Sequence, residues 1–180
     1  MSKLLNRKRK AQRHIDAAKS IKIDMTLDTI YDEWGDDYEP IGDAIPVWVF
    51  TARIDDKDIA ETHDVLALFH ECYPINVGWD ENKAKGQYFL TCSCGHAGCA
   101  GYWEPIVIRV KKDTVQWSTR KEHGYRNGVI GTGENVVYLK RDDYEECRKF
   151  ILDMFRSSPD HNFMIAGTHM TGREWLERIF

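Results

Sequence analysis

The stretch YWEPIVIRVKKDTVQWS, residues 102–118, decides how this chain of 180 residues folds. β-branched and aromatic residues dominate residues 102–110 and 114–118, and such residues favour strands. The polar triplet Lys111-Lys112-Asp113 lies between the two runs and predicts the turn of an antiparallel hairpin. We therefore expect a sheet that extends outward from this hairpin.

On the C-terminal side, a short strand is predicted at residues 136–140 and a helix at residues 142–156. The helix shows an apolar stripe at three- and four-residue spacing, formed by Tyr144, Cys147, Ile151, Met154 and Phe155. This stripe makes Cys147 an expected core residue. A last helix is predicted from Thr171 to Phe180, because Thr171 and Glu174 have the spacing of a capping box.

On the N-terminal side, apolar and polar residues alternate over residues 21–28, which is the period of a half-buried strand. Residues 45–54 and 86–92 also read as strands, and residues 58–72 as a helix that ends before Pro74. The expected architecture is α+β. A basic N-terminal arm at residues 1–20 precedes a single domain at residues 21–180, with a mainly antiparallel sheet and helices packed on it.

Composition excludes several classes of protein. The chain is 42% apolar and 30% charged, as in an ordinary globular domain. Its longest apolar runs, such as residues 47–50, are far shorter than the roughly 18 residues of a membrane span, so no membrane contact is expected. No apolar stretch follows the basic N-terminus, so we expect no secretory signal, a cytoplasmic location and reduced cysteines.

Charge is distributed unevenly along the chain. Residues 1–19 hold seven Lys or Arg against one acid, Asp16, and so carry +6; the rest carries −10, for a total of −4. Two interpretations stay open for this arm: binding to nucleic acid, whose phosphates attract clustered cations, or a solvated helix that pairs with an acidic segment. Residues 24–43 form that segment, with eight acids and no Lys or Arg.

Aromatic residues lie among these acids, at Tyr31, Trp34 and Tyr38. A surface that combines acids with aromatic anchors suits contact with a basic partner protein. The same residues also suit a cap that folds over the core, and both interpretations stay open.

The most specific motif is the loop TCSCGHAGCAG at residues 91–101. Three thiolates and one imidazole within eight residues are typical ligands of Zn²⁺, and the glycines permit a tight turn. We therefore predict a structural zinc held by Cys92, Cys94, Cys99 and His96, and call residues 92–99 the zinc loop. The fourth ligand is left open between His96 and three residues elsewhere, namely Cys72, His70 and His123.

Three other interpretations of the zinc loop compete with metal binding. Small cysteines in a glycine-rich turn also pack without a ligand. Cys94 and Cys99 would otherwise form a redox pair, or one of them would act as a catalytic thiolate beside His96 or His123.

The zinc loop and its flanking strands resemble a group of small uncharacterised bacterial proteins with a Cys-Gly-x-x-Gly-Cys loop between two strands. The similarity begins in YFLTCSCGHAGCAG (88–101), continues through residues 106–110 and 113–117, and ends at DDYEEC (142–147). It covers about residues 86–151. Some members look like immunity or accessory proteins, so the resemblance implies a binding protein more than an enzyme.

These observations favour a non-enzymatic cytosolic binding protein of the immunity or accessory type, which contacts a partner protein through residues 31–43. One alternative is a nucleic-acid-associated regulator that uses residues 1–19. The other is a thiol- or zinc-dependent enzyme centred on Cys94 or Cys99.

Overall fold

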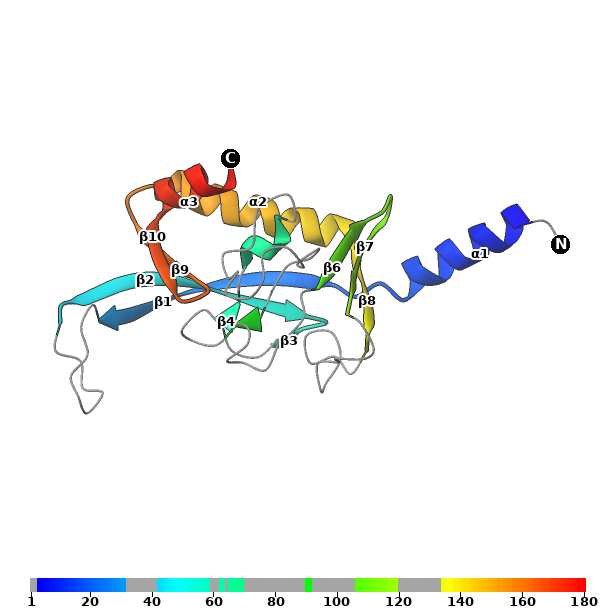
Figure 1. Cartoon of the computed structure of the whole chain (residues 1–180), viewed down its shortest axis with the longest axis horizontal. Coiled ribbons are helices and arrows are strands. Elements are labelled where there is room, and N and C mark those ends of the chain that lie inside the picture. The colour runs from blue at the N-terminus through cyan, green and yellow to red at the C-terminus, as the bar shows by residue number, and fades with distance from the viewer. Residues whose placement is uncertain are drawn as a thin grey trace, which may run out of the picture.

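Mostly antiparallel sheets with helices packed against them make up the fold, as the strand and helix signals predict (Figure 1). The structure is a computed structural model that describes residues 3–31, 42–58, 62–63, 65–69, 90–91, 106–119 and 134–180. The larger sheet has the order β1-β2-β9-β10. Its strands are β1 (Ile21–Tyr31), β2 (Ala44–Ile54), β9 (Asn162–Ile165) and β10 (Thr168–Thr171), with β3 (Lys57–Asp58) paired to β2.

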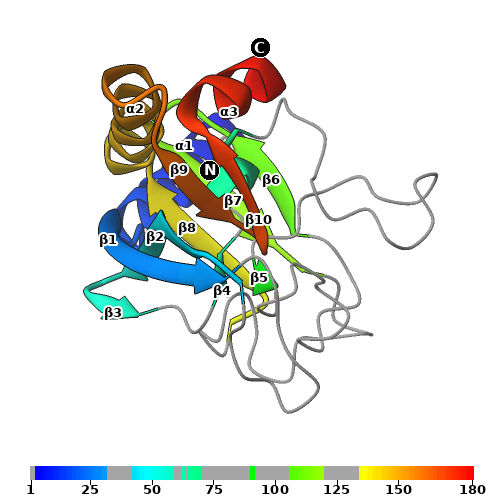
Figure 2. The same ribbon diagram turned by 90° about the vertical axis from the view of Figure 1, so that its left-hand side faces the viewer.

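Residues 107–118 form the predicted hairpin, as part of a second sheet (Figure 2). This sheet has the order β6-β7-β8, formed by β6 (Val107–Val110), β7 (Thr114–Ser118) and β8 (Val136–Lys140). The Lys111 amide donates to the Thr114 carbonyl oxygen at 2.8 Å and closes the turn. A small antiparallel pair, β4 (Thr62–His63) and β5 (Leu90–Thr91), stands apart from both sheets.

Three helices lie in the described ranges: α1 (Lys3–Asp16), α2 (Arg141–Ser157) and α3 (Gly172–Ile179). Four of the five residues of the predicted stripe are buried, namely Tyr144, Cys147, Ile151 and Phe155, and Met154 is half-buried and packs against the core. The capping box at the start of α3 is confirmed, because Thr171 Oγ1 accepts from the Glu174 amide and the Glu174 carboxylate accepts from the Thr171 amide.

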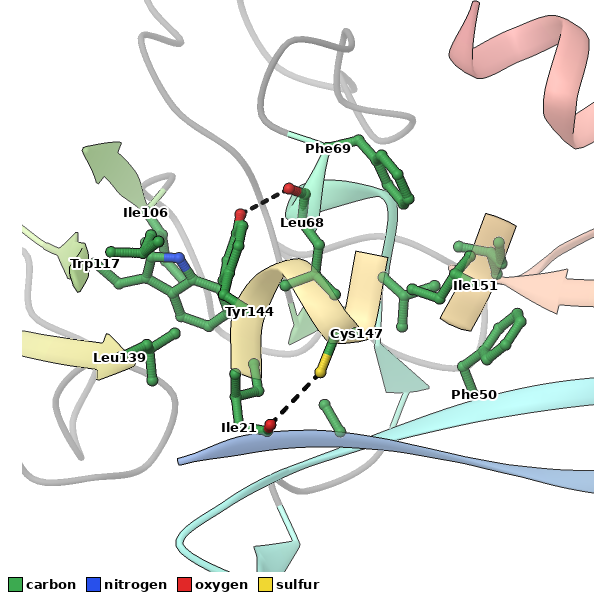
Figure 3. Packing of buried hydrophobic residues seen from close by; sticks show 14 of the residues in the cluster. Ile21, Phe50, Leu68, Phe69, Ile106, Trp117, Leu139, Tyr144, Cys147 and Ile151 are labelled. Carbon is green, nitrogen blue, oxygen red and sulfur yellow. Dashed lines mark hydrogen bonds between the residues drawn. The ribbon is translucent and has the colours of Figure 1, made fainter. Parts of the chain in front are cut away.

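One core joins the two sheets and α2 (Figure 3). Trp117 and Leu139 come from the second sheet, Ile21 comes from β1, and all three are fully buried against Tyr144 and its neighbours. Because the same apolar cluster holds both sheets, the chain folds as one α+β unit over the described residues.

The helix predicted at residues 58–72 is wrong. Asp58 lies in β3, Thr62 and His63 form β4, and among the described residues of this range the helical part is one 3₁₀ turn, Val65–Leu68. Val65 and Leu68 are fully buried, so their three-residue spacing reflects one buried turn rather than a continuous helical face. Strands β9 and β10 were not predicted, because four residues of alternation are too short a signal and β9 pairs with β2 in parallel, far away in sequence.

Candidate nucleic-acid interface

Helix α1 projects away from the two sheets, with its N-terminus at the far end (Figure 1). Residues 6–13 are all exposed. Arg7, Lys10 and His14 are spaced at i, i+3 and i+7, so they share one face of the helix. The basic arm of the sequence is therefore a helix with a continuous cationic face rather than a loose tail.

The chain after α1 fixes that helix to the edge of β8. Lys19 pairs with Leu139 in a parallel bridge, in which the Lys19 amide donates to the Tyr138 carbonyl oxygen at 2.8 Å. The Lys140 amide in turn donates to the Lys19 carbonyl oxygen at 2.9 Å. The Lys19 ammonium also lies 3.6 Å from the Glu134 carboxylate. These contacts fix the position at which the segment after α1 joins the second sheet.

A stacked pair of rings forms the junction between α1 and the sheet. The rings of His14 and Tyr138 lie 4.1 Å apart at an angle of 19°, and the Tyr138 hydroxyl is 3.2 Å from His14 Nε2. The pKa of His14 is lowered by burial and then by the positive charges of Lys111 and Lys10. One cation from the turn of the second sheet and one from α1 therefore act on the same imidazole.

The outer face of the second sheet continues this cationic face. Arg109, Gln116 and Tyr138 are direct neighbours across β6, β7 and β8, so their side chains lie on one face. Lys140 follows Tyr138 by two residues on the same face and is exposed, as is Arg109. The Lys111 ammonium lies 5.1 Å from the centre of the Tyr138 ring.

Together these cations form what we call the basic surface: Arg7 and Lys10 on α1, with Arg109, Lys111 and Lys140 on the second sheet. Arg and Lys side chains on a helix and an adjoining strand face are typical contacts for nucleic-acid phosphates. The sequence predicted the α1 part of this surface. It did not predict the sheet part, for which the only signal was the two-residue alternation that places Arg109 and Lys140 on the solvent face.

The predicted zinc ligands lie outside the described residues. This applies to Cys92, Cys94, Cys99 and His96, and to the alternatives Cys72, His70 and His123. Within the ranges that the structure describes, no three His, Cys, Asp or Glu side chains gather into a group able to hold a metal ion. The zinc site and its rival interpretations therefore stay predictions.

The acidic and aromatic segment is described only at its borders. Tyr31 is the last residue of β1 and Asp43 directly precedes β2, while residues 32–41, with Trp34 and Tyr38, lie outside the described residues. The predicted partner contact at residues 31–43 stays a prediction.

Cys147 is confirmed as a core residue. Its side chain is buried on α2, and its thiol donates to the Ile21 carbonyl oxygen at 3.5 Å (Figure 3). Burial, followed by the negative charges of Asp143 and Glu146, raises the pKa of this thiol to about 12. A thiol with that pKa stays protonated near neutral pH, so this environment does not activate Cys147 as a nucleophile.

Comparison of the chain with protein-family models, curated proteins and solved structures found no match. None of the helices in the described ranges is long and apolar enough to cross a membrane.

Proposed function

We propose that this protein binds double-stranded nucleic acid by its phosphate backbone, with the basic surface as the contact. The observation that supports this function most directly is the His14–Tyr138 stack, which joins the cationic face of α1 to cations on the second sheet. A projecting helix beside a basic sheet face contacts a duplex at two places. The two contacts together set the orientation of the duplex on the protein.

The dimensions of α1 suit this role. A helix with its side chains is about 10–12 Å across, which matches the roughly 12 Å width of the major groove of B-form DNA. The 14 residues of α1 extend over about 21 Å, enough to follow several phosphates. Residues 6–13 are exposed, so a duplex reaches the cationic face of the helix without any rearrangement of the body.

The charge of the remaining chain restricts where a duplex binds. Residues 1–19 carry +6 and the rest of the chain carries −10, so most of the body repels phosphate. Over the described residues, we expect nucleic acid to be held where Arg109, Lys111 and Lys140 lie on the sheet that adjoins α1. Contacts of this kind read backbone shape and charge, and we expect little dependence on base sequence.

Fluorescence anisotropy with a labelled duplex tests this function directly. The probes are DNA and RNA duplexes of roughly 20 base pairs, titrated over a range of salt concentrations. The variant R7Q/K10Q removes two cations from α1, and R156Q/R178Q removes two exposed or half-exposed cations from the ends of α2 and α3 as a matched control.

We expect salt-dependent binding by the wild-type chain, and a salt slope smaller by about 0.9 for each α1 cation removed when the duplex is DNA. The α2/α3 control should keep the wild-type slope. Absence of binding by the intact chain at low salt, or equal losses in both double variants, would refute the proposal.

A further inference from the structure

Strand β1 has one side that no described strand pairs with. It pairs with β2 along Ile21–Tyr31, and it stands at the end of the order β1-β2-β9-β10. The Ser20 carbonyl oxygen accepts from the Asp55 amide, next to the β2 end of this ladder. Main-chain groups point alternately to the two sides of an antiparallel strand. Because those of Ser20 point toward β2, those of the odd-numbered residues of β1 point away from β2.

Within the described ranges, side chains hydrogen-bond to the two ends of this outer edge but not to its middle. At one end the Cys147 thiol donates to the Ile21 carbonyl oxygen at 3.5 Å. At the other end the Asp28 carboxylate accepts from the Thr29 amide at 2.8 Å. Both contacts confirm that odd-numbered residues face outward. Between them, Met25 and Leu27 present their main-chain groups outward, as an incoming strand requires.

A groove lies along the start of this edge, between β1 and α2. It has a volume of about 330 Å³, and its lining includes Ile23 and Asp24 from β1 with Asp143, Glu146 and Phe150 from α2. An extended segment placed beside β1 would enter this groove. Grooves between an edge strand and a helix are a recurring way in which domains add a strand from a partner.

The side chains along the edge differ between the two faces of the sheet. Ile23, Met25 and Leu27 face the α2 side with the core, and Leu27 is 59% exposed. Asp24 and Asp28 lie on the opposite face. A strand that fits here therefore carries apolar residues on one face and cationic residues on the other.

A second copy of β1 fits this edge poorly. Antiparallel self-pairing centred on Thr26 sets Asp24 opposite Asp28, and like charges directly opposite one another destabilise a sheet. Pairing centred on Met25 would need the Ile21 carbonyl oxygen, which a thiol of α2 already holds. Acids on an edge strand oppose self-association in this way.

We propose that the outer edge of β1 is a docking site for an extended segment of a partner protein in which apolar residues alternate with Lys or Arg. The segment adds a strand beside Met25 and Leu27, places a cation near Asp28, and places its apolar residues toward Leu27 and Phe150. Asp24 already pairs with Arg53, whose Nε lies 3.2 Å from the Asp24 carboxylate. This site is independent of the basic surface and of any nucleic acid bound there.

A synthetic peptide of about nine residues that alternates lysine and valine is the probe, with binding measured by isothermal titration calorimetry. One control peptide has glutamate in place of lysine, and another is N-methylated at every second amide, which blocks main-chain pairing but keeps the charge. The protein variants are D28N and L27P, since the Leu27 amide is outside the β2 ladder. E177Q removes an exposed acid on α3, which does not line the groove, and serves as the matched control.

We expect the alternating peptide to bind, and its affinity to fall about fivefold for each main-chain hydrogen bond lost in L27P or in the N-methylated peptide. D28N should also weaken binding, while E177Q should not. D28N keeps the test decisive if L27P folds poorly. Equal binding of the N-methylated peptide would reduce the contact to charge alone and overturn the proposal. Self-association of the wild-type chain through β1, seen by ultracentrifugation and lost in L27P, would also overturn it.

Discussion

Replacing both Arg109 and Lys140 with Gln tests whether the second sheet contributes to nucleic-acid binding. Both side chains are exposed on the face that holds Tyr138, and neither lies on α1. If each contacts one phosphate, the double variant R109Q/K140Q loses about 1.8 from the slope of log affinity against log salt on DNA. When the salt concentration rises fourfold, the factor by which affinity falls is then about twelve times smaller for the variant than for the wild type.

The assay is anisotropy of a labelled DNA duplex at several salt concentrations, with circular dichroism to confirm that the variant is folded. Replacing Arg109 and Lys140 removes charge while α1 and its junction stay intact, so a change in slope belongs to the sheet. An unchanged slope in R109Q/K140Q, together with a reduced slope in R7Q/K10Q, would show that α1 binds alone. It would refute the argument that the His14–Tyr138 stack joins two parts of one surface.

Three further predictions concern the core, the thiol and the junction. Y144F should lower the free energy of unfolding by about 1–3 kcal/mol in urea titrations, because the buried Leu68 carbonyl oxygen loses its 2.7 Å partner; a loss near zero would contradict that bond. Cys147 should resist iodoacetamide in the native protein at pH 8 and react after unfolding, since its pKa is about 12; fast native labelling at this residue would argue against burial. An NMR titration of His14 should give a midpoint below 6.5. Because the folded state then binds fewer protons than the unfolded state, the junction should lose stability as pH falls below 6.5, and a midpoint above that value would contradict the arrangement around Tyr138.

Elements with a strong local signal were predictable from the sequence. The stripe from Tyr144 to Phe155 has the helical period over about three turns, and the Thr171–Glu174 pair marks a helix start by its own hydrogen bonds. The hairpin at residues 102–118 combines a polar turn with two β-branched runs. In each case neighbours in sequence supply the interactions, so the chain alone specifies the element.

Residues 58–72 show the limit of that reasoning. Val65 and Phe69 have the four-residue spacing that predicted a helix, yet the structure buries both, together with Leu68, at one short turn. The Tyr144 hydroxyl holds that turn through the Leu68 carbonyl oxygen, 76 positions away in sequence. Burial against a distant helix outweighed the local preference, because a short segment gains more from core contacts than from its own helical hydrogen bonds.

The sequence by itself determined that the chain forms an α+β fold, that its N-terminus is basic and that Cys147 lies in the core. Only the tertiary structure decided that His14 stacks on Tyr138, 124 positions away, and that Lys111 and Lys10 act on the same imidazole. It also decided that β1 lies at a sheet edge, because β9 returns to pair with β2 on the other side. Both proposed surfaces depend on contacts between residues far apart in the chain, and charge or periodicity along a sequence does not specify which distant segments meet.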